Sequence, residues 1–166
     1  MLDFGIVDTH VHLWDVGRLR YPWLDDIPLL NGSYLPSDYR KAHGPIAVEK
    51  MVFLQAEVEP RQSLDEAKWV ESRWSTTSRG WPGWCPGRRW RRVRRQPTLW
   101  DRLAEIPQVK GIRRIIWFED DLEFCLRPGF VRGVRLLERY GFSFDICISH
   151  EHMANTITLV RRCPNI

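Results

Sequence analysis

The chain has 166 residues, of which 43% are hydrophobic, and it carries a formal net charge of +4. This length is enough for the core of one domain, and no apolar run approaches the roughly 18 residues that a membrane span needs. The amino terminus lacks the basic-then-apolar pattern of a secretory signal, so we expect a cytoplasmic protein that does not bind membranes. The four cysteines form no C-x-x-C pair, which argues against a zinc knuckle or a disulfide framework.

The first predicted element is a strand over residues 5–11, and it delivers two histidines, His10 and His12. Side chains alternate along a strand, so residues two apart point the same way. Two imidazoles in this arrangement can hold one metal ion or one substrate oxygen. The same spacing also occurs in strands that bind nothing, so the pair alone leaves both interpretations open.

The second predicted element is a nearly continuous apolar strand over residues 50–57, as in a parallel sheet that is buried on both faces. A helix is expected next, because Ser63 and Glu66 have the spacing of a capping box. In that motif Ser63 accepts a hydrogen bond from the backbone N–H of Glu66, and the Glu66 side chain reaches back.

Residues 73–100 break the pattern. They hold eight arginines, five of the nine tryptophans and no acidic residue, so the rest of the chain has a net charge of +4 − 8 = −4. Arginine on phosphate and tryptophan on bases would suit single-stranded nucleic acid, and a basic segment can also lie on an anionic membrane, although glycine and proline would interrupt a helix here. A third interpretation is translation in the wrong frame, because GC-rich codons read off-frame give Arg, Trp, Gly and Pro. We favour the frame error and expect an apolar strand to be lost in this segment.

The second half returns to alternating elements. We expect a short helix over 98–105, a strand over 109–117 and a longer helix from Pro128 that ends before Gly141. A strand over 142–148 and a helix over about 151–162 follow.

Strands that alternate with helices predict an α/β fold, either a (β/α) barrel or a doubly wound sheet. No glycine-rich phosphate loop follows the first strand, which disfavours the nucleotide-binding version. A TIM barrel needs about 250 residues and eight strands, whereas this chain shows four strands, or five with the one in the basic segment. We therefore expect a partial (β/α)8 TIM barrel, with residues 1–166 forming a single truncated domain.

Four short segments carry a resemblance to a known family. They are Asp-Thr-His-Val-His-Leu-Trp-Asp at 8–15, Arg-Tyr-Pro-Trp-Leu at 20–24, Tyr-Leu-Pro-Ser-Asp-Tyr at 34–39 and Val-Lys-Gly-Ile-Arg-Arg at 109–114. Together they resemble the amidohydrolase-2 branch of the amidohydrolase superfamily, and within it the sugar-lactone and pyrone-dicarboxylate lactonases. The resemblance covers residues 1–72 and 98–166, and it implies a hydrolase that acts on a small lactone or a related cyclic ester or carboxylate.

The resemblance also implies roles for individual residues. His10 and His12 match histidines that bind a metal such as zinc in many amidohydrolases and that contact the substrate carbonyl directly in the lactonases, so a metal is possible but not required. Arg113 matches an arginine that contacts substrate carboxylate or lactone oxygens, a task suited to its planar set of donors; the alternative is a structural salt bridge.

Further pocket candidates are Gln55, Asp145 and His150, each at or near the end of a predicted strand. Asp145 lies in an otherwise apolar strand, where it should face the barrel mouth or pair with an arginine such as Arg113. Glu57 could face the same pocket or be a solvated residue at the strand end. Arg114, which points away from Arg113, is expected to be structural, His152 to be a surface residue and His43 to lie in a loop.

Lactone hydrolysis also needs a base that activates water. In the family this base is an aspartate at the end of the last barrel strand, and another histidine belongs to a strand that would begin just after Ile166. We therefore expect this chain to be incomplete and weakly active or inactive. Open barrel edges favour a homo-oligomer, and the alternative function is that of a small nucleic-acid-binding protein that uses residues 73–100.

Overall fold

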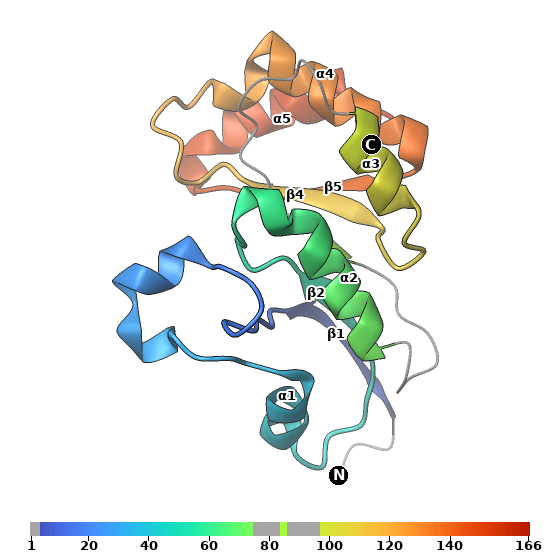
Figure 1. Ribbon diagram of the computed structural model, residues 1–166. Helices are drawn as coiled ribbons and strands as arrows, with labels where there is room; N and C mark the ends of the chain where they lie inside the picture. The colour runs from blue at the N-terminus through green and yellow to red at the C-terminus, as the bar shows by residue number, and fades with distance from the viewer. Residues whose placement is uncertain (1–3, 75–83, 86–96) are drawn as a thin grey trace.

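The computed structural model describes residues 4–74, 84–85 and 97–166, and these residues adopt an α/β fold (Figure 1). Within these ranges the strands are β1 (Ile6–Val11), β2 (Val48–Leu54), β3 (Trp84–Cys85), β4 (Gly111–Ile115) and β5 (Ser143–Cys147). The α-helices are α1 (Pro36–His43), α2 (Ser63–Trp74), α3 (Pro97–Ala104), α4 (Pro128–Leu136) and α5 (Met153–Arg162). Short 3-10 helices connect them at Pro22–Asp26, Pro28–Leu30, Pro60–Gln62, Phe124–Leu126, Leu137–Tyr140 and His150–His152.

The strands form two small parallel sheets, β1-β2-β3 and β4-β5. β3 lies next to β4, so the strands follow one another in chain order across both sheets. This order is the one expected for the first strands of a (β/α) barrel. The α/β prediction is thus confirmed, whereas the described part of the chain forms no closed barrel, and the prediction of a single truncated domain stays a prediction.

The pairing of β1 with β2 contains two register shifts, one between Ile6 and Val7 and a β-bulge between Asp8 and Val11. Asp8 pairs with Met51 and Val11 pairs with Phe53, so two residues of β1, Thr9 and His10, lie opposite one residue of β2. Bulges of this kind are rare in parallel pairs. The bulge immediately precedes Val11, where β1 ends, and His12 is the next residue.

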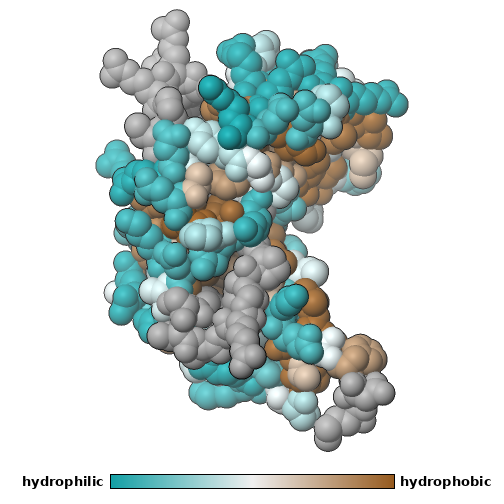
Figure 2. All heavy atoms as spheres, turned by 90° about the vertical axis from the view of Figure 1, so that its right-hand side faces the viewer, coloured by the Kyte–Doolittle hydropathy of each residue, from teal (hydrophilic) through white to brown (hydrophobic). Residues whose placement is uncertain are grey.

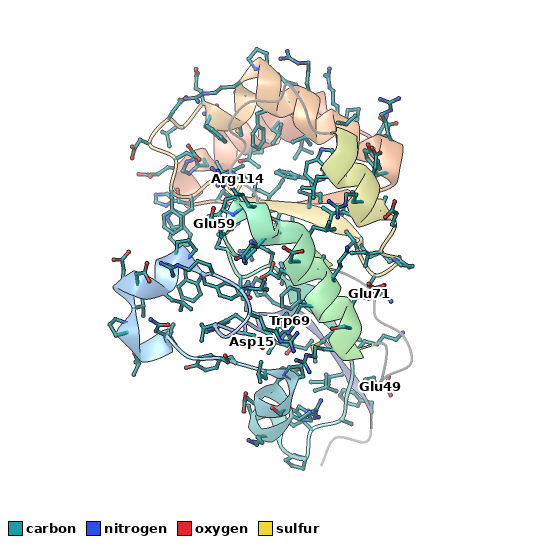
Figure 3. The ribbon with its side chains drawn as sticks, in the orientation of Figure 1. Asp15, Glu49, Glu59, Trp69, Glu71 and Arg114 are labelled. Atoms are coloured by element: carbon teal, nitrogen blue, oxygen red, sulfur yellow. The ribbon has the colours of Figure 1, made fainter. Side chains whose placement is uncertain are left out.

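The largest core cluster fills the space between the strands and helices α2 and α3. Its most buried members are Phe53, Leu103, Ile112 and Leu137, each with no exposed surface. Trp69 lies on the buried side of α2, where it belongs to the same cluster (Figure 3). These contacts join β1, β2 and β4 through one core and thereby position the strand ends that carry the polar side chains.

The expected capping box at the start of α2 is wrong. Ser63 already has helical backbone angles, and its hydroxyl donates to the carbonyl of Pro60 at 2.9 Å. The Glu66 side chain is fully buried, and its Oε1 accepts a hydrogen bond from the backbone N–H of Ala56 at 3.4 Å. The 3-10 turn at Pro60–Gln62 replaces the cap and leads directly into the helix.

Helix α1 is absent from the sequence-based prediction, and His43, expected in a loop, is its last residue. Pro36 suits the first turn, and the Asp38 carboxylate accepts a hydrogen bond from the backbone N–H of Leu35 at 2.9 Å. The other expected helices and strands are confirmed with shifts at their ends. The largest shift affects β2, which ends at Leu54, so that Gln55 and Glu57 lie in the following loop.

Most of the basic segment 73–100 lies outside the described residues. Within it, the backbone of Trp84–Cys85 forms β3 and pairs with Phe53 and Leu54 of β2, so the described part of the chain has five strands rather than four. The frame error and nucleic-acid binding both stay predictions. In the described ranges, no helix is both long and apolar enough to cross a membrane.

Candidate active site at the strand ends

The two histidines of the opening motif face each other. The Nε2 atoms of His10 and His12 lie 3.0 Å apart, and the rings meet edge to face with their centroids 4.9 Å apart. His10 is exposed and His12 is partly buried. The prediction that both side chains point the same way is therefore confirmed in the geometry.

His12 has a defined hydrogen-bonding arrangement. Its Nδ1 lies 3.0 Å from the carbonyl oxygen of Leu54, which can only accept, so Nδ1 carries the proton. Burial, and then the positive charges of Arg113 and His10, lower the pKa of His12 from 6.5 to about 4. At neutral pH the ring is uncharged, and its Nε2 lone pair accepts the N–H of His10.

Arg113 belongs to the same site, because its charge acts on His12. It lies in β4 and is 8% exposed. Its Nε is 3.6 Å from a carboxylate oxygen of Asp145, its partner in the register of β4 with β5, and its Nη2 donates to the Cys147 sulfur at 3.3 Å. The expected Arg113–Asp145 pair is present, and several N–H groups of the planar guanidinium are directed at neither partner.

The sequence-based interpretation did not include Cys147. Its signal was present, because Cys147 follows Asp145 at a spacing of two in a strand and so shares its face. The alternation that places Asp145 on this face of the strand therefore places Cys147 there as well.

Gln55 and Glu57 lie in the loop that follows β2. Gln55 is 2% exposed, and its Oε1 accepts no hydrogen bond from the described residues. Glu57 is partly buried and has a φ of +54°, which is uncommon for a residue with a side chain. The backbone of Gln55 contacts the His12 ring, so this loop borders the histidine pair.

The two histidines that follow β5 differ from the expectation. His150 is exposed, whereas His152, expected on the surface, is 2% exposed, and its Nδ1 lies 2.7 Å from the Ser149 hydroxyl. The cause is the 3-10 turn His150–His152, which turns His152 toward the molecule and His150 toward water. No contact places either ring beside His12 in the described structure.

Arg114 has the structural role expected for it. Its guanidinium pairs with Glu119 and donates to the carbonyl of Ile115, and it lies over the Phe124 ring, 5.5 Å from the ring centroid. This set of contacts anchors the loop after β4. The side chains of Arg113 and Arg114, which are neighbours in one strand, thus lie on opposite faces of the sheet.

The described residues contain no group of three His, Cys, Asp or Glu side chains that could hold a metal ion. His10 and His12 could supply two nitrogen ligands, and the contact of His12 Nδ1 with a carbonyl is common among metal-bound histidines. A catalytic zinc takes three protein ligands, so the pair by itself does not form a complete zinc site.

No family model matches the chain. The whole chain aligns with 61% of the uncharacterized protein y4mH of Sinorhizobium fredii, at 27% identity over 186 positions. The chain thus spans about 61% of the length of this curated relative.

Solved structures give a closer view of the fold. Amidohydrolase 2 from Bifidobacterium longum subsp. infantis matches with a TM-score of 0.68 and 19% identity, over 98% of this chain and 59% of that one. An amidohydrolase from Burkholderia multivorans with bound HEPES matches with a TM-score of 0.73 and 22% identity, over 98% of this chain and 55% of that one. A structure of an amidohydrolase from the same organism with bound zinc matches with a TM-score of 0.68 and 23% identity, over 98% of this chain and 55% of that one. The chain has the fold of rather more than half of these proteins.

Proposed function

We propose that the chain carries the first part of the active site of an amidohydrolase-2-type hydrolase whose substrate is a small lactone or a related cyclic ester. One observation carries the proposal: the histidine pair at the end of β1 lies within the electrostatic reach of a buried arginine of β4. The fold shared with solved amidohydrolases supports it.

The roles of the residues follow from their donors. The N–H of His10 points at His12 and can turn to a substrate carbonyl oxygen that enters beside it. Arg113 can donate to a carboxylate or to a lactone oxygen, and in a site that excludes water such donors stabilise the charge that develops on that oxygen. Asp145 attracts the guanidinium through its charge, since its carboxylate lies 3.6 Å from the Nε of Arg113, which forms no hydrogen bond within the described residues.

His12 is the fixed member of the pair. Because its pKa is about 4, the His12 ring stays neutral near pH 7. Its proton lies on Nδ1, so its Nε2 lone pair is free to orient His10. Gln55, with a buried Oε1 that accepts no hydrogen bond from the described residues, could take a substrate hydroxyl. A zinc ion, where bound, would polarise the substrate carbonyl, with His10 and His12 as two of its ligands.

The test combines binding and hydrolysis. Glucono-1,5-lactone and 2-pyrone-4,6-dicarboxylate are offered to the purified chain, with and without added zinc, and ring opening is followed by proton release and binding by calorimetry. Arg113→Lys keeps the charge and loses the planar donors, so we expect KM or Kd to rise about tenfold or more.

Arg127→Lys is the matched control, because Arg127 also pairs with an aspartate, Asp121, but on the surface and outside the site. It should leave binding and hydrolysis unchanged. If the wild-type chain neither binds nor opens these lactones, or if both lysine variants behave alike, the proposed function is wrong.

A further inference from the structure

His10 lies in a stretch of β1 whose register against β2 is irregular. In the parallel ladder Met51 and Phe53 of β2 are both buried in the main core cluster. Between Ile6 and Val7 the partner strand β2 has one extra residue, and between Asp8 and Val11 the extra residue is in β1, so the two shifts cancel and Val11 is the partner of Phe53. A slip of one residue moves a side chain to the other face of a sheet.

Thr9 and His10 together lie opposite one residue of β2, so His10 has no ladder partner of its own, whereas Val11 is the partner of Phe53. Val11 is 5% exposed and belongs to the main core cluster, whereas His10 is exposed and faces His12. The position of the His10 ring thus depends on what holds this irregular stretch of β1.

Two side chains close the bulge. Asp8 Oδ1 accepts the backbone N–H of His10 at 3.1 Å. Asp8 Oδ2 accepts the hydroxyl of Tyr39, from helix α1, at 2.8 Å. Burial and the neighbouring Asp8 carboxylate raise the pKa of Tyr39 to about 12, so its hydroxyl remains a donor at neutral pH.

We propose that Asp8 and Tyr39 are positioning residues that hold the β1 bulge and thereby set His10 against His12. Asp8 replaces the ladder partner for the His10 N–H, and Tyr39 fixes the Asp8 carboxylate from a different element. Helix α1 is connected to β1 through this hydrogen bond. The inference rests on the proposed function for its meaning, but its geometry can be tested without any substrate.

The experiment uses nuclear magnetic resonance of the whole chain. In the wild type we expect cross-relaxation between the imidazole protons of His10 and His12 and slow exchange of the His10 amide proton. Tyr39→Phe removes only the hydroxyl, and it should weaken the ring contact and speed His10 amide exchange about tenfold, as expected for a hydrogen bond that loses its support.

Tyr140→Phe is the matched control, because the Tyr140 hydroxyl donates to Asp101 at the same distance of 2.8 Å, in another part of the fold. It should change neither signal. A second pair of variants tests Asp8 itself: Asp8→Ala should abolish the ring contact, and Asp8→Asn, whose side-chain oxygen still accepts the His10 N–H, should restore it.

The proposal is overturned if Tyr39→Phe and Asp8→Ala both keep the ring contact and the slow exchange, since the bulge would then hold itself. A general loss of folding would change the amide spectra of α4 and α5 as well, so those signals are recorded in the same sample. If the ring contact depends on Tyr39 while no lactone is bound or hydrolysed, the positioning role stands and the proposed function fails.

Discussion

At the scale of the residue, Arg113 and Arg114 show that two adjacent positions of one strand can have entirely different contacts. Both are buried, at 8% and 6% exposure, yet one lies beside Asp145 and Cys147 and the other beside Glu119 and Phe124. Alternation along β4 assigns them to opposite faces. A buried guanidinium needs an acidic partner, and each arginine has its own.

Glu66 is a buried carboxyl without a basic partner among the described residues that contact it. Burial, and then the nearby charge of Glu57, raise its pKa well above the ordinary value. Below about pH 4.5 both the folded and the unfolded chain hold this proton. As the pH rises, the unfolded chain releases the proton first, so the free energy of unfolding falls until the folded carboxyl also ionises.

Glu66→Gln keeps the shape and the acceptor for the Ala56 N–H but cannot ionise. We expect it to match the wild type near pH 4.5 and to be more stable at pH 8 by about 1 kcal/mol or more. Urea unfolding at the two pH values measures the difference. Glu71→Gln, on the partly exposed side of the same helix (Figure 3), is the control. A Glu66→Gln advantage that is equal at both pH values would contradict a protonated Glu66.

At the scale of the element, Gly141 ends the helical segment before β5. Its φ is +64°, and an added Cβ would meet no atom within 4 Å. Gly141→Ala should therefore cost about 1 kcal/mol of unfolding free energy through the backbone alone. Gly32→Ala is the matched control, because Gly32 is equally open and its φ is not positive. Equal stability of the two variants in urea unfolding would show that Gly141 does not require this conformation.

The elements differ in how far the sequence predicts them. Gly141 and the apolar face of α4 indicate that helix and its end, because both signals are local. α1 has no buried residue and few apolar ones, so no periodic signal marks it. The capping box failed because its spacing is also compatible with Glu66 turning inward toward Ala56.

The site was predictable where strand alternation sufficed. The common direction of the His10 and His12 side chains follows from a period of two, and the Arg113–Asp145 pair was expected because a carboxylate in an apolar strand needs a basic partner. The bulge could not be predicted, because it depends on the register of β1 against β2. His152 was misplaced because a 3-10 turn, rather than a strand or an α-helix, carries it.

At the scale of the whole molecule, the described part of the chain leaves sheet edges open. β1 pairs only with β2, and β5 pairs only with β4, among the described strands. β5 borders an apolar hollow of about 40 Å³, lined by Phe144, Ile146 and Leu159 among others. Apolar side chains reach the surface in the upper part of the molecule, beside the recess that separates it from the lower part (Figure 2).

Open edges and exposed apolar side chains favour pairing with another chain, so we expect the purified chain to self-associate. Ile146→Lys places a charge on the open β5 strand and should shift the population toward monomer in sedimentation velocity. Ile157→Lys is the control, because Ile157 is an isoleucine at 45% exposure on the neighbouring helix α5. Equal shifts would assign the contact to the helical surface instead of the strand edge. A wild-type chain that sediments as a monomer and melts in one sharp transition would show that the edges are closed within the chain.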